Sequence, residues 1–188
     1  MALLDVVVYG HPTLRRVARP LKVEEIDQKF IEDMIETMRV KDGIGLAAPQ
    51  VDVPVRLIVV AMDAENAQVV INPEIFAHSE RDVIGPEGCL SLPGLQGEVA
   101  RNDRVLVRGL DRHGQSIEIK VSGLMARVFQ HEIDHLNGDL YIDRAESDSM
   151  VWLEKEGEQK TSVAEIRDRY LEIYHRHSTQ VEFDKPEA

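Results

Sequence analysis

The stretch GLMARVFQHEIDHLNG, residues 123–138, decides the fold of this chain. Its apolar residues recur at helical spacings and form one wide face, made of Leu124, Val128, Phe129, Ile133 and Leu136. An apolar face of this width predicts a helix that is buried in the core of the protein. Gly138 stands at the position where glycine commonly ends a helix, so the helix is expected to run from about residue 123 to residue 137.

The same helix carries His131 and His135, four residues apart. Side chains at this spacing lie one above the other on a helix face, so both imidazoles can reach one metal ion. Glu132 follows the first histidine and can accept a proton from a metal-bound water. Chance matches to HExxH are common, so alone the string leaves ordinary polar residues as an equal alternative. The apolar surroundings favour the metal, because buried polar groups need partners.

The segments around this helix predict an α+β fold. An amphipathic helix spans about residues 24–40, and a loop of small residues follows from Gly43 to Gln50. Apolar runs predict strands at 55–61, 69–75, 104–110 and 116–121, and their tight connections favour antiparallel pairing. Residues 146–160 are charged and loop-like, and a capping box at Ser162 opens a last helix.

We therefore expect antiparallel β-sheets packed around a central metal-binding helix, with an N-terminal and a C-terminal helix. A chain of 188 residues without repeats is expected to form a single catalytic domain over residues 1–188, in which about 178–188 are a flexible tail.

The composition argues against several classes of protein. A net charge of -12 disfavours nucleic-acid binding through a positive surface field. No apolar run reaches the roughly 18 residues that span a bilayer, and the N-terminus has no signal-peptide pattern. The single cysteine cannot form an internal disulfide and fits a reducing compartment. We expect a cytoplasmic protein with neither a membrane nor a nucleic acid as its partner.

A catalytic metal ion commonly takes three protein ligands and leaves a further position for water. Cys89, in the predicted loop EGCLSLPG over residues 87–94, is one candidate for the third ligand. The alternative candidates are three glutamates after the helix, at a distance like that in thermolysin-type proteases: Glu154, Glu156 and Glu158. Without a metal, Cys89 would be a small buried apolar residue.

The loop GIGLAAPQ, residues 43–50, offers a third element. Its two glycines would let an extended substrate backbone approach closely, and Gln50 would offer an amide donor to a developing oxyanion. Taken alone, this loop is better interpreted as a simple connection between a helix and a strand.

The three elements GIGLAAPQ, EGCLS and QHEIDHLNG, in this order and at these separations, resemble the motifs of the peptide deformylase family. The resemblance runs from the early helix to about Asp143. It implies that Cys89, His131 and His135 bind one divalent metal ion, physiologically Fe(II), for which Zn, Ni or Co can substitute. Glu132 would be the general base and acid. The substrate would be a nascent polypeptide that begins with N-formylmethionine, and the formyl group would leave as formate.

The resemblance also implies how the substrate is held. The Gln50 side chain and the backbone N–H of Leu90 would form the oxyanion hole. The backbone around Ile44 and Gly45 would pair with the peptide as an added strand. The methionine pocket would be lined by Ile44, Leu124, Val128 and the His131 ring. Arg127 would lie at the pocket edge, with its stem packed and its head in water.

Several roles stay open at this point. Glu87 and Asp134 are candidates for orienting the ligand histidines, and Arg101 for pairing with Glu87, against the alternative that all three are surface residues. In some deformylases the C-terminal helix docks on the ribosome, but here a solvated helix face is the favoured interpretation. The competing functions are a zincin-like endopeptidase and a non-catalytic domain with a closed structural metal site.

Overall fold

The computed structural model describes residues 2–61, 66–146, 148–154 and 157–160, with side chains up to Leu153. Its helical elements are η1 (Pro12–Arg15), η2 (Val23–Glu25), α1 (Gln28–Val40), η3 (Ala48–Val51), α2 (Gly123–Asn137) and η4 (Tyr141–Asp143). Its strands are β1 (Gly45–Ala47), β2 (Leu57–Ala61), β3 (Ala67–His78), β4 (Asp82–Cys89), β5 (Leu92–Asn102), β6 (Arg104–Leu110), β7 (Ser116–Ser122), β8 (Val151–Glu154) and β9 (Gly157–Lys160).

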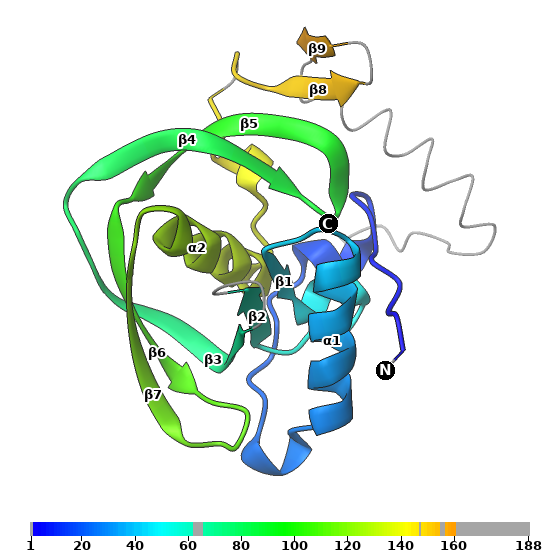
Figure 1. Ribbon diagram of the computed structural model, residues 1–188, viewed down its shortest axis with the longest axis vertical. Coiled ribbons are helices and arrows are strands. Elements are labelled where there is room, and N and C mark those ends of the chain that lie inside the picture. The colour runs from blue at the N-terminus through cyan, green and yellow to red at the C-terminus, as the bar shows by residue number, and fades with distance from the viewer. Residues whose placement is uncertain (1, 62–65, 147, 155–156, 161–188) are drawn as a thin grey trace, which may run out of the picture.

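The strands form two sheets. One has the order β1-β2-β3-β6-β7 and the other β4-β5-β8-β9. All pairs between these named strands are antiparallel, as the tight connections predicted. In Figure 1, α2 lies in the middle, with the arch of β4 and β5 on one side and the β6–β7 hairpin on another. The expected α+β fold is confirmed.

The helix α2 occupies the range predicted from its sequence, residues 123–137. Its apolar face packs against strands of the larger sheet, where Ile58, Val60 and Val107 belong to the same buried cluster as Phe129 and Leu136. Leu124 departs from the prediction, because it is 61% exposed in the first turn and belongs to the surface of a cleft.

Gly138 ends α2 in the left-handed conformation, with φ of 80°. A Cβ at this position would stand 2.8 Å from the carbonyl oxygen of Arg15, so η1 leaves no room for a side chain. The predicted glycine cap is confirmed, and it also brings the N-terminal segment against the end of the central helix.

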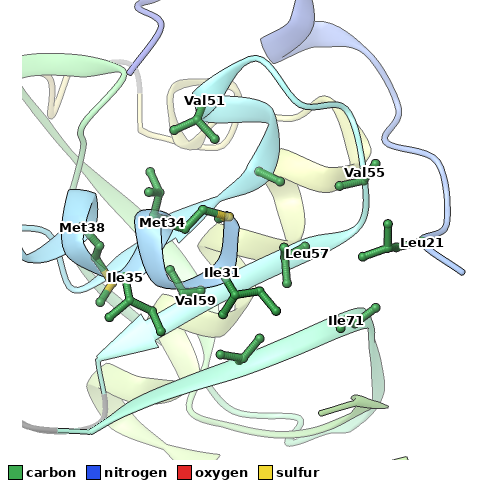
Figure 2. Close-up of a cluster of buried hydrophobic side chains, with 13 residues drawn as sticks. Leu21, Ile31, Met34, Ile35, Met38, Val51, Val55, Leu57, Val59 and Ile71 are labelled. Carbon is green, nitrogen blue, oxygen red and sulfur yellow. The ribbon is translucent and has the colours of Figure 1, made fainter. Parts of the chain in front are cut away.

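The helix α1 begins four residues later than predicted, because Val23–Glu25 forms a separate 3-10 turn. The carboxylate of Asp27 caps the helix by accepting from the backbone N–H groups of Lys29 and Phe30. Figure 2 shows the apolar face of α1 directed at the larger sheet, where these side chains meet Leu57, Val59 and Ile71. The resulting core supports β1 and β2 from the side opposite to α2.

Three segments that were expected to be loops contain strands. The segment around the expected loop 87–94 forms β4 and β5, residues 45–47 form β1 ahead of the η3 turn, and residues 151–154 and 157–160 form the paired strands β8 and β9. These segments are rich in glycine, proline and charged residues, which disfavour strands locally. Their hydrogen-bonded partners in the sheet, which local sequence does not reveal, stabilise them instead.

The expected C-terminal helix from Ser162, with its possible ribosome contact, and the tail at 178–188 lie outside the described residues. Within the described part of the chain, no helix has the length and apolar character needed to cross a membrane.

Candidate metal centre and active site

Cys89, His131 and His135 converge at one point in the structure. Their ligand atoms all lie within 4.8 Å of one another, and Cys89 Sγ is 3.3 Å from His135 Nε2. Cys89 is the last residue of β4, and both histidines lie on buried turns of α2. One thiol and two imidazoles that point at a common centre are a suitable donor set for a zinc-like or ferrous ion.

The remaining ring nitrogen of His131 is occupied by a carboxylate. His131 Nδ1 lies 2.8 Å from Glu87 Oε2, which leaves Nε2 as the nitrogen available to the donor cluster. Arg101 donates two hydrogen bonds to Glu87, at 2.9 and 3.0 Å. Burial raises the pKa of Glu87, but the hydrogen bonds from His131 and Arg101 outweigh it and lower this pKa to about 2. Glu87 is therefore ionised, and the predicted Glu87–Arg101 pair is present.

Asp134 has a different role from the one expected. Its carboxylate accepts hydrogen bonds from Arg101 and from Arg144 rather than from either candidate ligand histidine. It thus holds Arg101 from the side opposite to Glu87. His135 Nδ1 is buried and has no hydrogen-bond partner among the described residues.

Glu132 lies in the same cleft as the donor cluster, and it is 4% exposed. Its Oε2 has no hydrogen-bond partner among the described residues. Burial raises the pKa of this carboxyl to about 7, with a further rise from Glu87 and an opposing effect of His131. A carboxyl with such a pKa exchanges protons readily near neutral pH. This unpartnered oxygen, beside three convergent donors, is the feature that fits a bound metal ion with its water.

Gly45 leaves the space that the Glu132 carboxylate occupies. A Cβ at residue 45 would stand 2.3 Å from Glu132 Oε1 and 2.8 Å from its Cγ and Cδ. The sequence pointed to this glycine for a close approach of substrate backbone, and the structure adds a close approach to Glu132.

Gln50 is held in one orientation by the backbone of Ala47, three residues before it. Its Oε1 accepts from the N–H of Ala47 at 2.8 Å, so its amide nitrogen faces the donor cluster. Gln50 Nε2 lies 3.3 Å from Cys89 Sγ and 3.3 Å from Ser91 Oγ. The amide nitrogen of Gln50 is therefore held at the edge of the donor cluster, where it donates to Cys89 and Ser91.

The cleft that contains these groups has a volume of about 690 Å³. The predicted catalytic, substrate-binding and metal-binding residues all line it, except His135, which is 1% exposed; the supporting candidates Arg101 and Asp134 do not line it. The sequence reasoning missed a second group of lining residues, and these are Val6, Val8, Leu92, Pro93, Gly94, Leu95, Gln96 and Leu153. The first two belong to an apolar run at residues 6–9, which the sequence shows. Leu153 stands among charged residues, and nothing in the sequence around it indicates that it lines a cleft.

Arg127 contradicts one expectation. Its head group does not lie in water but donates to the carbonyl oxygens of Val83, Gly85 and Val99, at 2.6, 3.1 and 2.7 Å, and to Glu87 at 2.8 Å. The guanidinium satisfies carbonyls of β4 and β5 and so ties this hairpin to α2. Sequence could not show this, because the partner strands were not predicted.

Known proteins resemble the chain over most of its length. The family model for polypeptide deformylase matches residues 3–150. The peptide deformylase of Carboxydothermus hydrogenoformans is 49% identical over 152 residues, which cover 78% of this chain and 96% of that protein. The peptide deformylase of Thermodesulfovibrio yellowstonii is 49% identical over 149 residues, covering 77% of this chain and 90% of the other.

Solved structures that resemble this chain are peptide deformylases as well. The crystal structure of the peptide deformylase from Thermotoga maritima matches with 43% identity and a TM-score of 0.74, over 78% of this chain and 99% of that one. The enzyme from Legionella pneumophila matches with 34% identity and a TM-score of 0.76, over 96% of this chain and 100% of that one. With its Cys/His/His cluster, its fold and these matches, the chain belongs to the peptide deformylase family, metal-dependent hydrolases that remove the formyl group from the N-terminal N-formylmethionine of nascent polypeptides.

Proposed function

We propose that this protein deformylates N-formylmethionyl peptides in the cleft between β1, β4 and α2, with residues 1–188 as a single catalytic domain. The observation that supports this most strongly is the convergence of Cys89, His131 and His135 beside the unpartnered carboxyl oxygen of Glu132. The cytoplasm is its proposed location, because a reducing compartment keeps the Cys89 thiol available as a ligand.

Cys89, His131 and His135 would hold one divalent ion. A thiolate and two imidazoles suit Fe(II) as well as Zn, and we propose Fe(II) as the physiological ion, with Zn, Ni or Co able to replace it. When bound, such an ion polarises a carbonyl and lowers the pKa of water towards about 7. Glu87 would keep the His131 ring in the orientation and tautomer that this ligation requires.

Glu132 would move the protons of the reaction. It accepts a proton from the attacking water as the water oxygen bonds to the formyl carbon. It then gives the proton to the methionine nitrogen as the carbon–nitrogen bond breaks, which yields formate and a free amine. Burial raises the pKa of this carboxyl, which favours a group that can both accept and return a proton.

Gln50 and the backbone N–H of Leu90 would stabilise the oxygen of the formyl group as it gains negative charge. Gln50 is suited to this because Ala47 fixes its amide and its Nε2 faces the cluster. A preorganised donor of this kind typically contributes about 2.7–4 kcal/mol to lowering the barrier.

The peptide would bind alongside β1. This strand is at the edge of its sheet and pairs only with β2 among the described strands, so the backbone around Ile44 and Gly45 can add a peptide strand. The methionine side chain would enter the part of the cleft lined by Ile44, Leu124, Val128 and the His131 ring. The stem of Arg127 would form part of this wall, while its head holds β4 and β5 in place.

Two competing functions are less well supported. In a zincin-like endopeptidase the third ligand would be Glu154, Glu156 or Glu158, whose side chains lie outside the described residues, whereas Cys89 already supplies the third donor. In a structural metal site the donors would be closed off, but this cluster opens into a cleft that contains Glu132. A ribosome contact through the last helix stays a prediction, tested by ribosome pelleting after truncation at Ser162.

The direct test is formate release from formyl-Met-Ala-Ser, measured without oxygen on protein loaded with Fe(II) and, in parallel, with Zn. We expect turnover with both ions, faster with Fe(II). Cys89→Ala should lose bound metal and activity together, and Glu132→Gln should keep its metal but lose activity. An active Cys89→Ala variant would overturn the proposed ligand set, and full activity in Glu132→Gln would overturn the proposed base.

A further inference from the structure

The β8–β9 hairpin contributes Leu153 to the wall of the cleft. β8 pairs with β5 through Trp152 opposite Leu95 and Val151 opposite Gln96. Trp152 is 6% exposed and belongs to the buried cluster of Leu92, Leu95 and Tyr141. This buried tryptophan anchors the hairpin to β5, so that the next residue, Leu153, is held at a fixed place on the cleft surface.

Leu153 is an apolar side chain that the fold leaves uncovered. It is 44% exposed and lines the cleft. Its neighbour across the ladder is Gly94, where a Cβ would lie 3.7 Å from the carbonyl oxygen of Leu153. Gly94 has a φ of 80°, which favours glycine, so the residue beside Leu153 contributes no side chain that could cover it.

Exposed apolar side chains gather around this cleft. Among the large apolar residues that the structure describes as exposed, Ile44, Leu124 and Leu153 line it, and they come from three separate segments of the chain. Apolar side chains that line a cleft and remain open to solvent are typical of a ligand-binding surface. The proposed function uses Ile44 and Leu124 for the methionine, and it leaves Leu153 without a role.

The substrate has more chain than the methionine. A cleft of about 690 Å³ is larger than one side chain, and a peptide that pairs with β1 continues past its first residue. Successive side chains of an extended peptide alternate between two sides, so a residue after the methionine points again towards the cleft walls. Leu153 supplies an apolar surface on one of those walls.

We propose that Leu153 is a specificity-determining residue that contacts an apolar side chain of the peptide beyond its formylmethionine. This proposal rests on the proposed deformylase function and extends it to the downstream residues. β8 begins at residue 151, directly after the last residue that the family model matches.

The experiment compares formate release from formyl-Met-Ala-Ala, formyl-Met-Leu-Ala and formyl-Met-Ala-Leu by the full-length metal-loaded protein. Wild type should prefer one leucine peptide over the alanine peptide by about fivefold in kcat/KM, through a lower KM, as expected for partial burial of one leucine. Leu153→Ser should abolish this preference by raising the KM for the preferred leucine peptide, and Leu153→Ile should retain most of it. Leu3→Ser is the matched control, because Leu3 is 58% exposed and does not line the cleft.

Each other result overturns the proposal. The proposed contact would be excluded if wild type showed no preference for a leucine peptide. It would also be excluded if the Leu153→Ser variant kept that preference. An equal loss of kcat/KM on all three peptides, together with a lower melting temperature, would assign Leu153 a structural role in the hairpin instead. Absence of formate from every peptide with wild type would instead defeat the deformylase function, which separates the two failures.

Discussion

Replacing Gly45 with alanine should disable the enzyme through Glu132 while leaving the fold and the metal in place. The added Cβ would lie 2.3 Å from Glu132 Oε1, which is 1.1 Å short of the 3.4 Å at which ordinary contact begins. Gly45 is not among the glycines with positive φ, so alanine is compatible with the backbone, and the carboxylate must move. A displacement of about 1 Å in a catalytic group costs roughly 100-fold in rate, and we expect a kcat lowered by about that factor.

The assay is formate release with formyl-Met-Ala-Ser, beside metal content and melting temperature for each variant. Overpacking of this kind costs about 1–3 kcal/mol of stability, which a folded domain can tolerate. A double-mutant cycle tests the reasoning: in a Glu132→Gln background, Gly45→Ala should reduce the residual rate little further, because both changes remove the same function. The reasoning would be refuted if the two substitutions lowered the rate by independent factors that multiply in the double variant. A Gly45→Ala variant with the kcat of wild type would refute it as well.

The other predictions concern the groups that support the site and the fold. Glu87→Gln should weaken metal retention about 10- to 100-fold, because His131 loses its carboxylate partner; competition with a chelator measures this, and unchanged retention would contradict it. Asp27→Ala removes the cap of α1 and should lower the free energy of unfolding by about 1 kcal/mol in a urea titration, with formate release unaffected. The pKa of Asp143 is lowered, since the hydrogen bonds from Arg15 and from the backbone outweigh burial, which raises it. A lowered carboxyl pKa stabilises the fold above the ordinary value of 3.8 and stops doing so as the pH falls through the folded value. The stability difference between wild type and Asp143→Asn should therefore be largest near neutral pH and shrink in acid, and a constant difference from pH 7 to 3 would count against the pair.

The parts of the fold that local sequence determines could be predicted closely. The apolar face of α2 and its terminal Gly138 define the helix to the residue, and the apolar runs at 104–110 and 116–121 define the strands β6 and β7 closely. In these segments the local conformational preference and the tertiary packing favour the same structure.

The β4–β5 hairpin could not be predicted in this way. β4 contains Gly85, Pro86 and Gly88, which local preference would place in a turn, but its ladder with β5 and the bonds from Arg127 to its carbonyls hold it extended. Cys89 was therefore expected in a loop, although it ends a strand.

The site could be predicted where residue chemistry determines it, and less well where packing does. The donors and Glu132 follow from residue type and spacing, and they converge as expected. Leu153 lines the cleft only because Trp152 anchors its hairpin on β5, and nothing in the charged sequence around it indicates that anchor.

The donor cluster joins two layers of the protein, since its thiol comes from the end of β4 and its imidazoles from α2. Neither layer supplies all three donors, so a full set of ligands for an ion would exist only where the hairpin lies against the helix. Metal binding and the docking of this hairpin would then be coupled, so that each stabilises the other and a local opening at the end of β4 would weaken the hold on the ion.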